Sequence, residues 1–241
     1  MTVIWESARA LKPQERPFEA QADRPHILLN AAMTLDGKIA TRSGDSKISS
    51  EEDLVHLHHL RASVDAVVVG IETILVDDPQ LTVRRVQGRN PDRVILDSAA
   101  RTPTEAKVLS AKAGRTIIAV TESASKTRVD ALLRAGAEVI VAGSGDRVDL
   151  RLLMNRLRGM GIRHILVEGG GNVNWGLLEL GLVDEIRVAV APVIVGGREA
   201  VTLVEGNGFG RVRDGIKLVL QRIEQCGEDL VLTYRPARTE G

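Results

Sequence analysis

From Pro25 to Pro236 the chain alternates short apolar runs with amphipathic stretches, and this alternation is typical of an α/β fold. Most of the apolar runs consist of Val, Ile and Leu between glycine or charged residues, as in strands buried on both faces of a parallel sheet. Strands are expected at His26–Met33, Ala66–Gly70, Arg93–Asp97, Thr116–Thr121, Glu138–Ala142, His164–Glu168 and Glu185–Ala191. Helices are expected at about Ser50–Ser63, Lys126–Ala135, Leu150–Gly159 and Val173–Leu180. The pattern predicts a mostly parallel sheet with helices on both faces.

The pattern changes beyond Pro192. Val193–Val195, Ile216–Gln225 and Leu230–Tyr234 alternate without room for helices between them, so we expect antiparallel strands that include a terminal hairpin at a sheet edge. Residues 1–24 hold two prolines and many charges and are expected to form an N-terminal extension, with one helical turn around Glu6 to Leu11. Residues 25–236 form a single predicted domain, and residues 237–241 form a tail.

Charge and composition exclude several classes of function. Lys plus Arg equals Asp plus Glu at 32 each, and aromatic residues make up only 2% of the chain, so we expect no nucleic-acid or membrane partner. Cys226 is the only cysteine, which excludes an intrachain disulfide and a multi-cysteine zinc site. Without an apolar membrane span or a signal-peptide core, the chain is expected to be soluble and cytoplasmic.

A run of three glycines follows the strand that ends in Glu168. Glycines let a backbone approach a ligand closely, and the free N–H groups at the start of the next helix favour an anion. The alternative is a tight strand-to-helix turn that needs glycine only for geometry. Gly169, Gly170 and Gly171 stand at the carboxyl end of a strand, where open α/β sheets bind ligands, so we favour a ligand site. A carboxylate on a buried strand also needs a partner, which favours a functional role for Glu168.

Two further segments carry candidate site residues. Asp36-Gly37 is a strong turn pair and could be a simple hairpin, but Lys38 follows it between apolar neighbours, and we weigh turn and site equally. The segment from Thr73 to Arg84 follows a strand, and its Asp-Asp-Pro is either part of a site or a helix stop. Arg84 and Arg61 are candidate phosphate clamps, although an isolated arginine is more often a solvated surface charge.

Three histidines crowd the first expected helix. His56 and His59 stand three residues apart, a spacing that can ligate a metal, and His58 lies between them. No cysteine and no H-E-x-x-H spacing accompanies them, so we interpret them as a partly exposed helix face and expect no metal site.

Taken together, the motifs resemble a known family. N-A-A-M-T-L-D-G-K-I-A, D-S-K-I-S, V-G-I-E-T-I-L-V-D-D-P-x-L-T-V-R, V-I-L-D-S, L-V-E-G-G-G-x-x-N-W and A-P-V-I-V-G-G-R-E-A occur in this order. They resemble the riboflavin-biosynthesis pyrimidine reductases, and the match covers nearly the whole chain from Pro25 onward. Bacterial relatives usually carry an N-terminal zinc deaminase domain, whose H-x-E and P-C-x-x-C motifs do not occur here.

The resemblance implies a dihydrofolate reductase-like fold, a homodimer and a stand-alone enzyme of the archaeal and fungal type. Such an enzyme would use NADPH to reduce 2,5-diamino-6-ribosylamino-4(3H)-pyrimidinone 5′-phosphate to its ribitylamino product, with the hydride delivered to C1′ of the opened ribose imine. The alternatives are a reductase of the same fold acting on the deaminated uracil analogue or a dihydropterin, and a non-catalytic nucleotide-binding protein.

The resemblance also implies roles for individual residues. Lys38 and Glu168 would face the substrate's ribose as catalytic residues. The expected cofactor residues are Thr73, Asp77, Ser98, Arg101, Gly169, Gly170, Gly171 and Asn172, with the 2′-phosphate near Ser98 and Arg101. The rest of the substrate would be enclosed by Ser46, Arg61, Leu81 and Arg84. Near Ser46 the chain departs from bacterial members, which often have a tryptophan where Ile48 follows Lys47.

Overall fold

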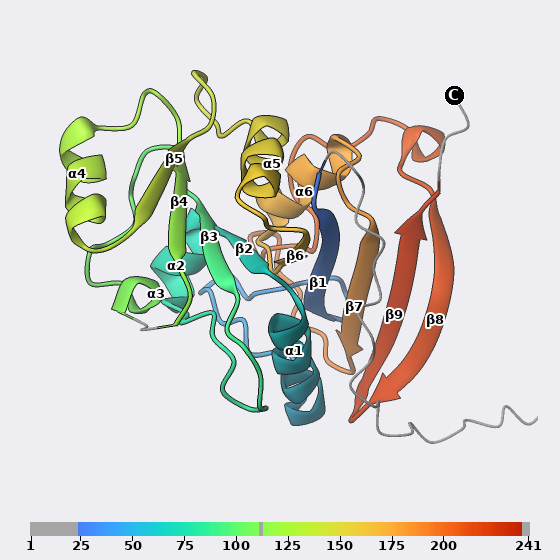
Figure 1. Ribbon diagram of the computed structural model, residues 1–241. Helices are drawn as coiled ribbons and strands as arrows, with labels where there is room; N and C mark the ends of the chain where they lie inside the picture. Colours follow the sequence, from blue (N-terminus) through green and yellow to red (C-terminus); the bar gives the residue numbers. More distant parts are fainter. Residues whose placement is uncertain (1–23, 111–112, 238–241) are drawn as a thin grey trace, which may run out of the picture.

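One nine-stranded sheet runs through the computed structural model, which describes residues 24–110 and 113–237 (Figure 1). The strand order is β5-β4-β3-β2-β6-β1-β7-β9-β8. The strands are β1 (His26–Thr34), β2 (Ala66–Gly70), β3 (Asp92–Leu96), β4 (Thr116–Val120), β5 (Glu138–Val141), β6 (His164–Val167), β7 (Glu185–Ala191), β8 (Leu218–Cys226) and β9 (Asp229–Pro236). Strands β1 to β7 pair in parallel, whereas β9 pairs antiparallel with both β7 and β8. The expected mostly parallel sheet with an antiparallel terminal pair is confirmed.

Helices cover both faces of the sheet. They are α1 (Glu51–Ser63), α2 (Ile71–Asp77), α3 (Lys107–Ser110), α4 (Lys126–Arg134), α5 (Leu150–Gly159) and α6 (Gly171–Glu179), with a 3-10 turn η1 (Val212–Asp214). One buried cluster includes residues of α5 and α6, among them Leu153 and Leu177. A second cluster, formed by the other set of strand side chains, includes residues of α2, α3 and α4, among them Ile74, Val108 and Leu132. Each face of the sheet therefore has its own core.

Helix α1 begins as its sequence predicts. The Ser50 hydroxyl accepts a hydrogen bond from the backbone N–H of Asp53, and acidic residues occupy the first turn. The Ser50 hydroxyl also donates to the carbonyl of Cys226, and the Ser50 N–H donates to the Asp229 carboxylate. These bonds attach the start of α1 to the β8–β9 hairpin.

Several local expectations were wrong. Val193–Val195 is not a strand, because its backbone bonds with the turn after β1: Leu35 N–H donates to the Val193 carbonyl and Val195 N–H donates to Asp36. The helices expected from the sequence did not include α2, α3 or η1, which are too short to show a helical period. The helix turn expected around Glu6 to Leu11 lies outside the described residues. No helix in the described ranges has both the length and the apolar character needed to cross a membrane.

Candidate active site

The expected site residues follow the carboxyl ends of four neighbouring parallel strands. Parallel strands end at the same edge of a sheet, so β1, β2, β3 and β6 bring these segments together. Along this edge, Lys38 follows β1, Thr73 and Asp77 lie on α2 after β2, Ser98 and Arg101 follow β3, and the segment from Glu168 to Asn172 follows β6.

Two glycines of the run have structural reasons to lack a side chain. Gly169 has a φ of +93°, which side-chain-bearing residues rarely adopt, and its carbonyl accepts from Gly70 N–H at 2.9 Å. A Cβ on Gly171 would lie 2.6 Å from Cγ of Glu205 and 2.7 Å from the Thr202 carbonyl oxygen. The loop is therefore held against β2 on one side and against residues 202–205 on the other.

Helix α6 begins directly in the glycine run. Gly170 is its N-cap residue and supplies no side-chain cap. Val173 N–H donates to the Gly170 carbonyl, whereas the N–H groups of Gly171 and Asn172 have no hydrogen-bond partner among the described residues and can bind an anion. One turn in, Asn174 is buried, and its Nδ2 donates to the Leu203 carbonyl at 2.8 Å. Its Oδ1 is buried without a hydrogen-bond partner in the described part of the chain. The close approach of the backbone and the free N–H groups suit the phosphates of a nucleotide.

Glu168 forms a bidentate ion pair with Arg61 of α1. Nε of Arg61 lies 2.7 Å from Oε1, and Nη2 lies 2.6 Å from Oε2. Both side chains are nearly buried, with relative exposures of 8% for Arg61 and 11% for Glu168. Burial alone would lower the pKa of Arg61, but the Glu168 charge raises it above the ordinary value. The pair fixes the orientation of the Glu168 carboxylate.

Arg84 adds a second guanidinium group beside this pair. Its side chain is exposed and donates to the Thr82 hydroxyl at 2.8 Å, while Arg61 donates to the Thr82 carbonyl at 3.1 Å. Partial burial and the neighbouring charges of Arg61 and Arg85 lower the pKa of Arg84. This local excess of positive charge suits an anionic group of a ligand.

Lys38 lies in the turn after β1. Gly37 has a φ of +80°, and the Thr34 N–H donates to the Lys38 carbonyl at 2.8 Å. The chain does not continue into a second hairpin strand, because Lys38 forms an isolated antiparallel bridge with Thr202. Nζ of Lys38 donates to the Ala200 carbonyl at 3.2 Å. Within residues 24–110 and 113–237, no hydrogen bond or ion pair joins Lys38 to Glu168.

Asp36 stabilises the same turn. Its carboxylate accepts from the Thr34 hydroxyl at 2.6 Å and from the N–H groups of Val195 and Gly196. The Thr34 hydrogen bond is the main reason why the pKa of Asp36 falls to about 2.

The other expected residues surround this edge more loosely. Ser46 donates a hydrogen bond to Asp77 at 3.2 Å, and burial raises the pKa of Asp77 above its ordinary value. Thr73 is half-buried one helical turn before Asp77. Leu81 has a φ of +53°. Its side chain is buried and packs in the core.

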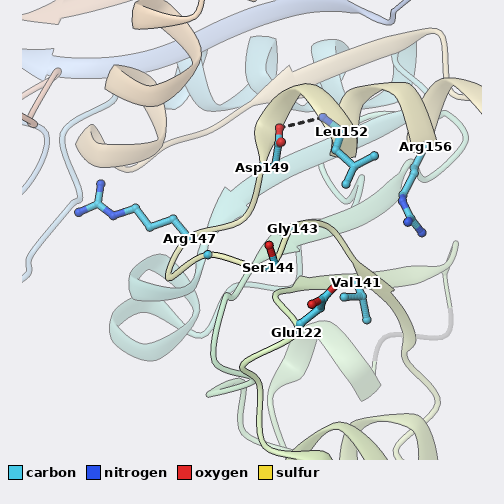
Figure 2. A pocket seen from close by; sticks show the side chains of 9 residues that line it. Glu122, Val141, Gly143, Ser144, Arg147, Asp149, Leu152 and Arg156 are labelled. Carbon is cyan, nitrogen blue, oxygen red and sulfur yellow. Dashed lines mark hydrogen bonds between the residues drawn. The ribbon is translucent and has the colours of Figure 1, made fainter.

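Ser98 lies beside a cavity of about 730 Å³ beyond β4 and β5 (Figure 2). The Ser98 hydroxyl accepts from Val148 N–H at 3.1 Å, and both neighbours of Val148 line the cavity. The lining residues are Glu122, Val141, Gly143, Ser144, Gly145, Arg147, Asp149, Leu152 and Arg156. Figure 2 shows Asp149 capping α5 through Leu152, with Arg147 and Arg156 on opposite sides of the view.

Arg101, the other residue expected near a 2′-phosphate, pairs with Glu72 at 2.5 Å. Both side chains are largely exposed, so the Arg101 guanidinium is accessible to a competing anion.

The sequence interpretation missed two segments at this edge. The first is the cavity loop, whose G-S-G-D-R after a strand's carboxyl end is a signal of the same kind as the glycine run. The second is residues 200–205, which contact both Lys38 and Gly171. The sequence around them was interpreted only as turns. Of the three histidines of α1, His58 accepts a hydrogen bond from Arg84 N–H. Among the described residues, no group of three or more His, Cys, Asp or Glu side chains could hold a metal ion.

The chain is similar over most of its length to known proteins of one family. Residues 25–232 match the family described as the RibD C-terminal domain. A protein of Methanothermobacter thermautotrophicus named 2,5-diamino-6-ribosylamino-4(3H)-pyrimidinone 5′-phosphate reductase is 56% identical over 88% of this chain and 98% of that protein. The riboflavin biosynthesis protein RibD of Actinobacillus pleuropneumoniae is 38% identical over 89% of this chain and 57% of its own length.

Solved structures show the same fold. Acinetobacter baumannii RibD superposes with a TM-score of 0.77 at 27% identity, covering 90% of this chain and 59% of that one. The Saccharomyces riboflavin biosynthesis reductase Rib7 superposes with a TM-score of 0.68 at 21% identity, covering 91% of this chain and 93% of that one.

Proposed function

The chain belongs to the RibD C-terminal domain family, and from this membership we propose that it is an NADPH-dependent 2,5-diamino-6-ribosylamino-4(3H)-pyrimidinone 5′-phosphate reductase. The observation that carries the proposal is the 56% identity to the Methanothermobacter thermautotrophicus reductase across 98% of that protein. The product would be the ribitylamino compound of riboflavin biosynthesis. When bound, NADPH supplies the hydride that reduces C1′ of the opened ribose.

The glycine run and its surroundings would hold the cofactor. Gly169 to Asn172 would bind the pyrophosphate through backbone N–H groups at the start of α6, where the structure leaves no space for a Cβ on Gly171. Thr73 and Asp77 would lie along the nicotinamide half. Ser98 and Arg101 would bind the 2′-phosphate, and the adjoining cavity offers space for the adenosine.

Arg61 and Glu168 would act together on the substrate. The Glu168 carboxylate can accept hydrogen bonds from ribose hydroxyls, and Arg61 fixes its direction. Lys38 uses one donor on Ala200 and keeps others for the sugar, where it would supply a proton to the ring oxygen as the ring opens. Arg84 would bind the phosphate, with Ser46 and the backbone at Leu81 enclosing the rest.

The proposal is tested by incubating the purified protein with NADPH and the diaminopyrimidinone substrate. We expect NADPH oxidation and, by mass spectrometry, the ribitylamino product. The deaminated uracil analogue should give a lower kcat/KM than the diaminopyrimidinone. A higher kcat/KM for the uracil compound would reverse the assigned substrate, and tight NADPH binding without turnover of either compound would favour a nucleotide-binding protein. The positive charge of Arg84, beside the Arg61–Glu168 ion pair, supports a phosphorylated substrate over a dihydropterin.

A further inference from the structure

Residues 200–205, which we call the strap, are hydrogen-bonded on one side to the turn that contains Lys38. The N–H of Ile39 donates to the Val201 carbonyl at 2.8 Å, and the N–H of Leu203 donates to the Gly37 carbonyl at 3.1 Å. Between these bonds, Lys38 and Thr202 pair as an antiparallel bridge. Nζ of Lys38 donates to the Ala200 carbonyl at 3.2 Å. The strap therefore holds both the backbone and the ammonium group of Lys38.

The second side of the strap is bonded to the glycine run. Glu205 N–H donates to the Gly171 carbonyl at 3.1 Å, and Nδ2 of the buried Asn174 donates to the Leu203 carbonyl at 2.8 Å. The Glu205 side chain and the Thr202 carbonyl fill the space that a Cβ on Gly171 would need. Just beyond the strap, Gly206 packs against the Trp175 ring of α6, so closely that a Cβ there would lie 2.2 Å from the ring.

The Glu205 carboxylate is hydrogen-bonded to Thr202 within the same strap. Its Oε1 accepts hydrogen bonds from both the N–H and the hydroxyl of Thr202, each at 2.7 Å. These bonds to Thr202 are the main reason why the pKa of Glu205 is lowered, and the positive charge of Lys38 lowers it further. One anionic side chain thus lies between the residue that pairs with Lys38 and the glycine that begins α6.

We propose that Glu205 is a positioning residue that holds Lys38 at a fixed place relative to the glycine run. The substrate site and the cofactor site then keep a fixed position relative to each other. The inference rests on the proposed function, in which Lys38 faces the ribose and the glycine run faces the cofactor. Val201 and Val204 of the strap are exposed, so the side chain of Glu205 and the backbone hydrogen bonds, rather than apolar packing of these two residues, connect the strap to its neighbours. A displacement of about 1 Å at a reacting group can cost roughly 100-fold in rate, so a loosened strap lowers turnover.

The test compares Glu205→Ala, Glu205→Gln and the control Glu199→Ala. We expect kcat to fall roughly tenfold to 100-fold in Glu205→Ala. Gln keeps the Oε1 acceptor and should restore most of this loss, whereas Glu199, exposed in the same loop, should be dispensable. Thr202→Val removes one donor to Glu205 and should lower kcat in the same direction, which provides a second variant if Glu205→Ala folds poorly. Trp175 fluorescence, measured in a Trp5→Phe background, reports whether the strap remains docked on α6.

A double-mutant cycle separates positioning from general stability. If Glu205 acts through Lys38, then Glu205→Ala should change kcat little in a Lys38→Ala background. Fully additive losses, or wild-type kcat in both Glu205→Ala and Thr202→Val, would overturn the inference. Absence of NADPH-dependent turnover in the wild type would instead refute the proposed function, so the two failures are distinguishable.

Discussion

Lys38 and Glu168 are the residues on which the chemistry depends most directly. Ring opening moves a proton at the sugar, and general acid–base groups usually contribute about 10²–10⁴-fold to rate. We expect Lys38→Ala and Glu168→Gln each to lower kcat within that range, while NADPH affinity, measured by fluorescence titration, changes little. Near wild-type turnover in both variants would place the catalytic groups elsewhere.

Arg101 is expected to determine cofactor preference. Its guanidinium is exposed, and its one ion pair among the described residues is with the exposed Glu72. Such a pair has a small energetic value, and a phosphate can replace it. A charge-assisted hydrogen bond to the 2′-phosphate contributes on the order of 1.5–3 kcal/mol, or roughly tenfold or more in selectivity. The ratio of kcat/KM for NADPH over NADH should fall by this factor in Arg101→Ala. Equal use of both cofactors by the wild type would contradict the assignment.

Three histidines make the folded state sensitive to acid. Burial is the main cause that lowers the pKa of His26, His56 and His58 to about 4, from an ordinary value of 6.5. The unfolded chain therefore binds protons more readily between these values, so stability is full above 6.5 and decreases as the pH falls toward 4. Asp36 titrates below this window. Urea unfolding should give a lower free energy of unfolding at about pH 5 than at about pH 7, with a smaller difference in His58→Asn. Equal stabilities would contradict the shifted values.

At the scale of residues, the sequence identified Arg61 and Glu168 separately but not their ion pair. The two are 107 positions apart in the sequence, and only the tertiary fold brings α1 and the end of β6 together. The expectation that Lys38 and Glu168 share one sugar likewise depends on tertiary distance, which no local motif encodes.

At the scale of elements, long periodic segments were predictable and short ones were not. The strands β2 and β7 were expected with the bounds that they have, because each is an apolar run flanked by charge or glycine. Helix α2 has only seven residues, too few to show a helical period. Helix α6 starts at Gly171, two residues before the expected start, because glycine has low helix propensity and only tertiary contacts place it there.

The cap of α1 offers a stability test at this scale. Ser50→Ala removes the acceptor for Asp53 N–H and the donor to the Cys226 carbonyl. Helix α1 therefore loses both its N-terminal cap and one hydrogen bond to the β8–β9 hairpin. Loss of a serine cap costs about 1 kcal/mol. The free energy of unfolding should fall by about this amount or more in Ser50→Ala. Ser63→Ala, at the exposed end of the same helix, is the matched control and should change it less.

At the scale of the whole molecule, the alternating pattern was enough to predict a single sheet. It did not predict which surface would associate with another chain. Strand β8 pairs with β9 on one side and ends the sheet on the other (Figure 1). It exposes Leu218, Leu220 and Ile223, although long apolar edge strands are normally protected. An uncovered edge of this kind favours association with a second copy, in agreement with the homodimer that the family resemblance implies.

The geometry of β8 suits a symmetric dimer. An antiparallel pairing of two copies about a two-fold axis at Ile223 would set Arg222 of one copy opposite Glu224 of the other. We therefore expect a dimer by analytical ultracentrifugation. Leu220→Lys on the edge strand should give a monomer, because burying an unpaired charge in the interface is costly. Leu133→Lys, which replaces an exposed leucine of α4 far along the sheet, should leave the dimer intact. A monomeric wild type, or a dimer that survives Leu220→Lys, would exclude β8 as the interface.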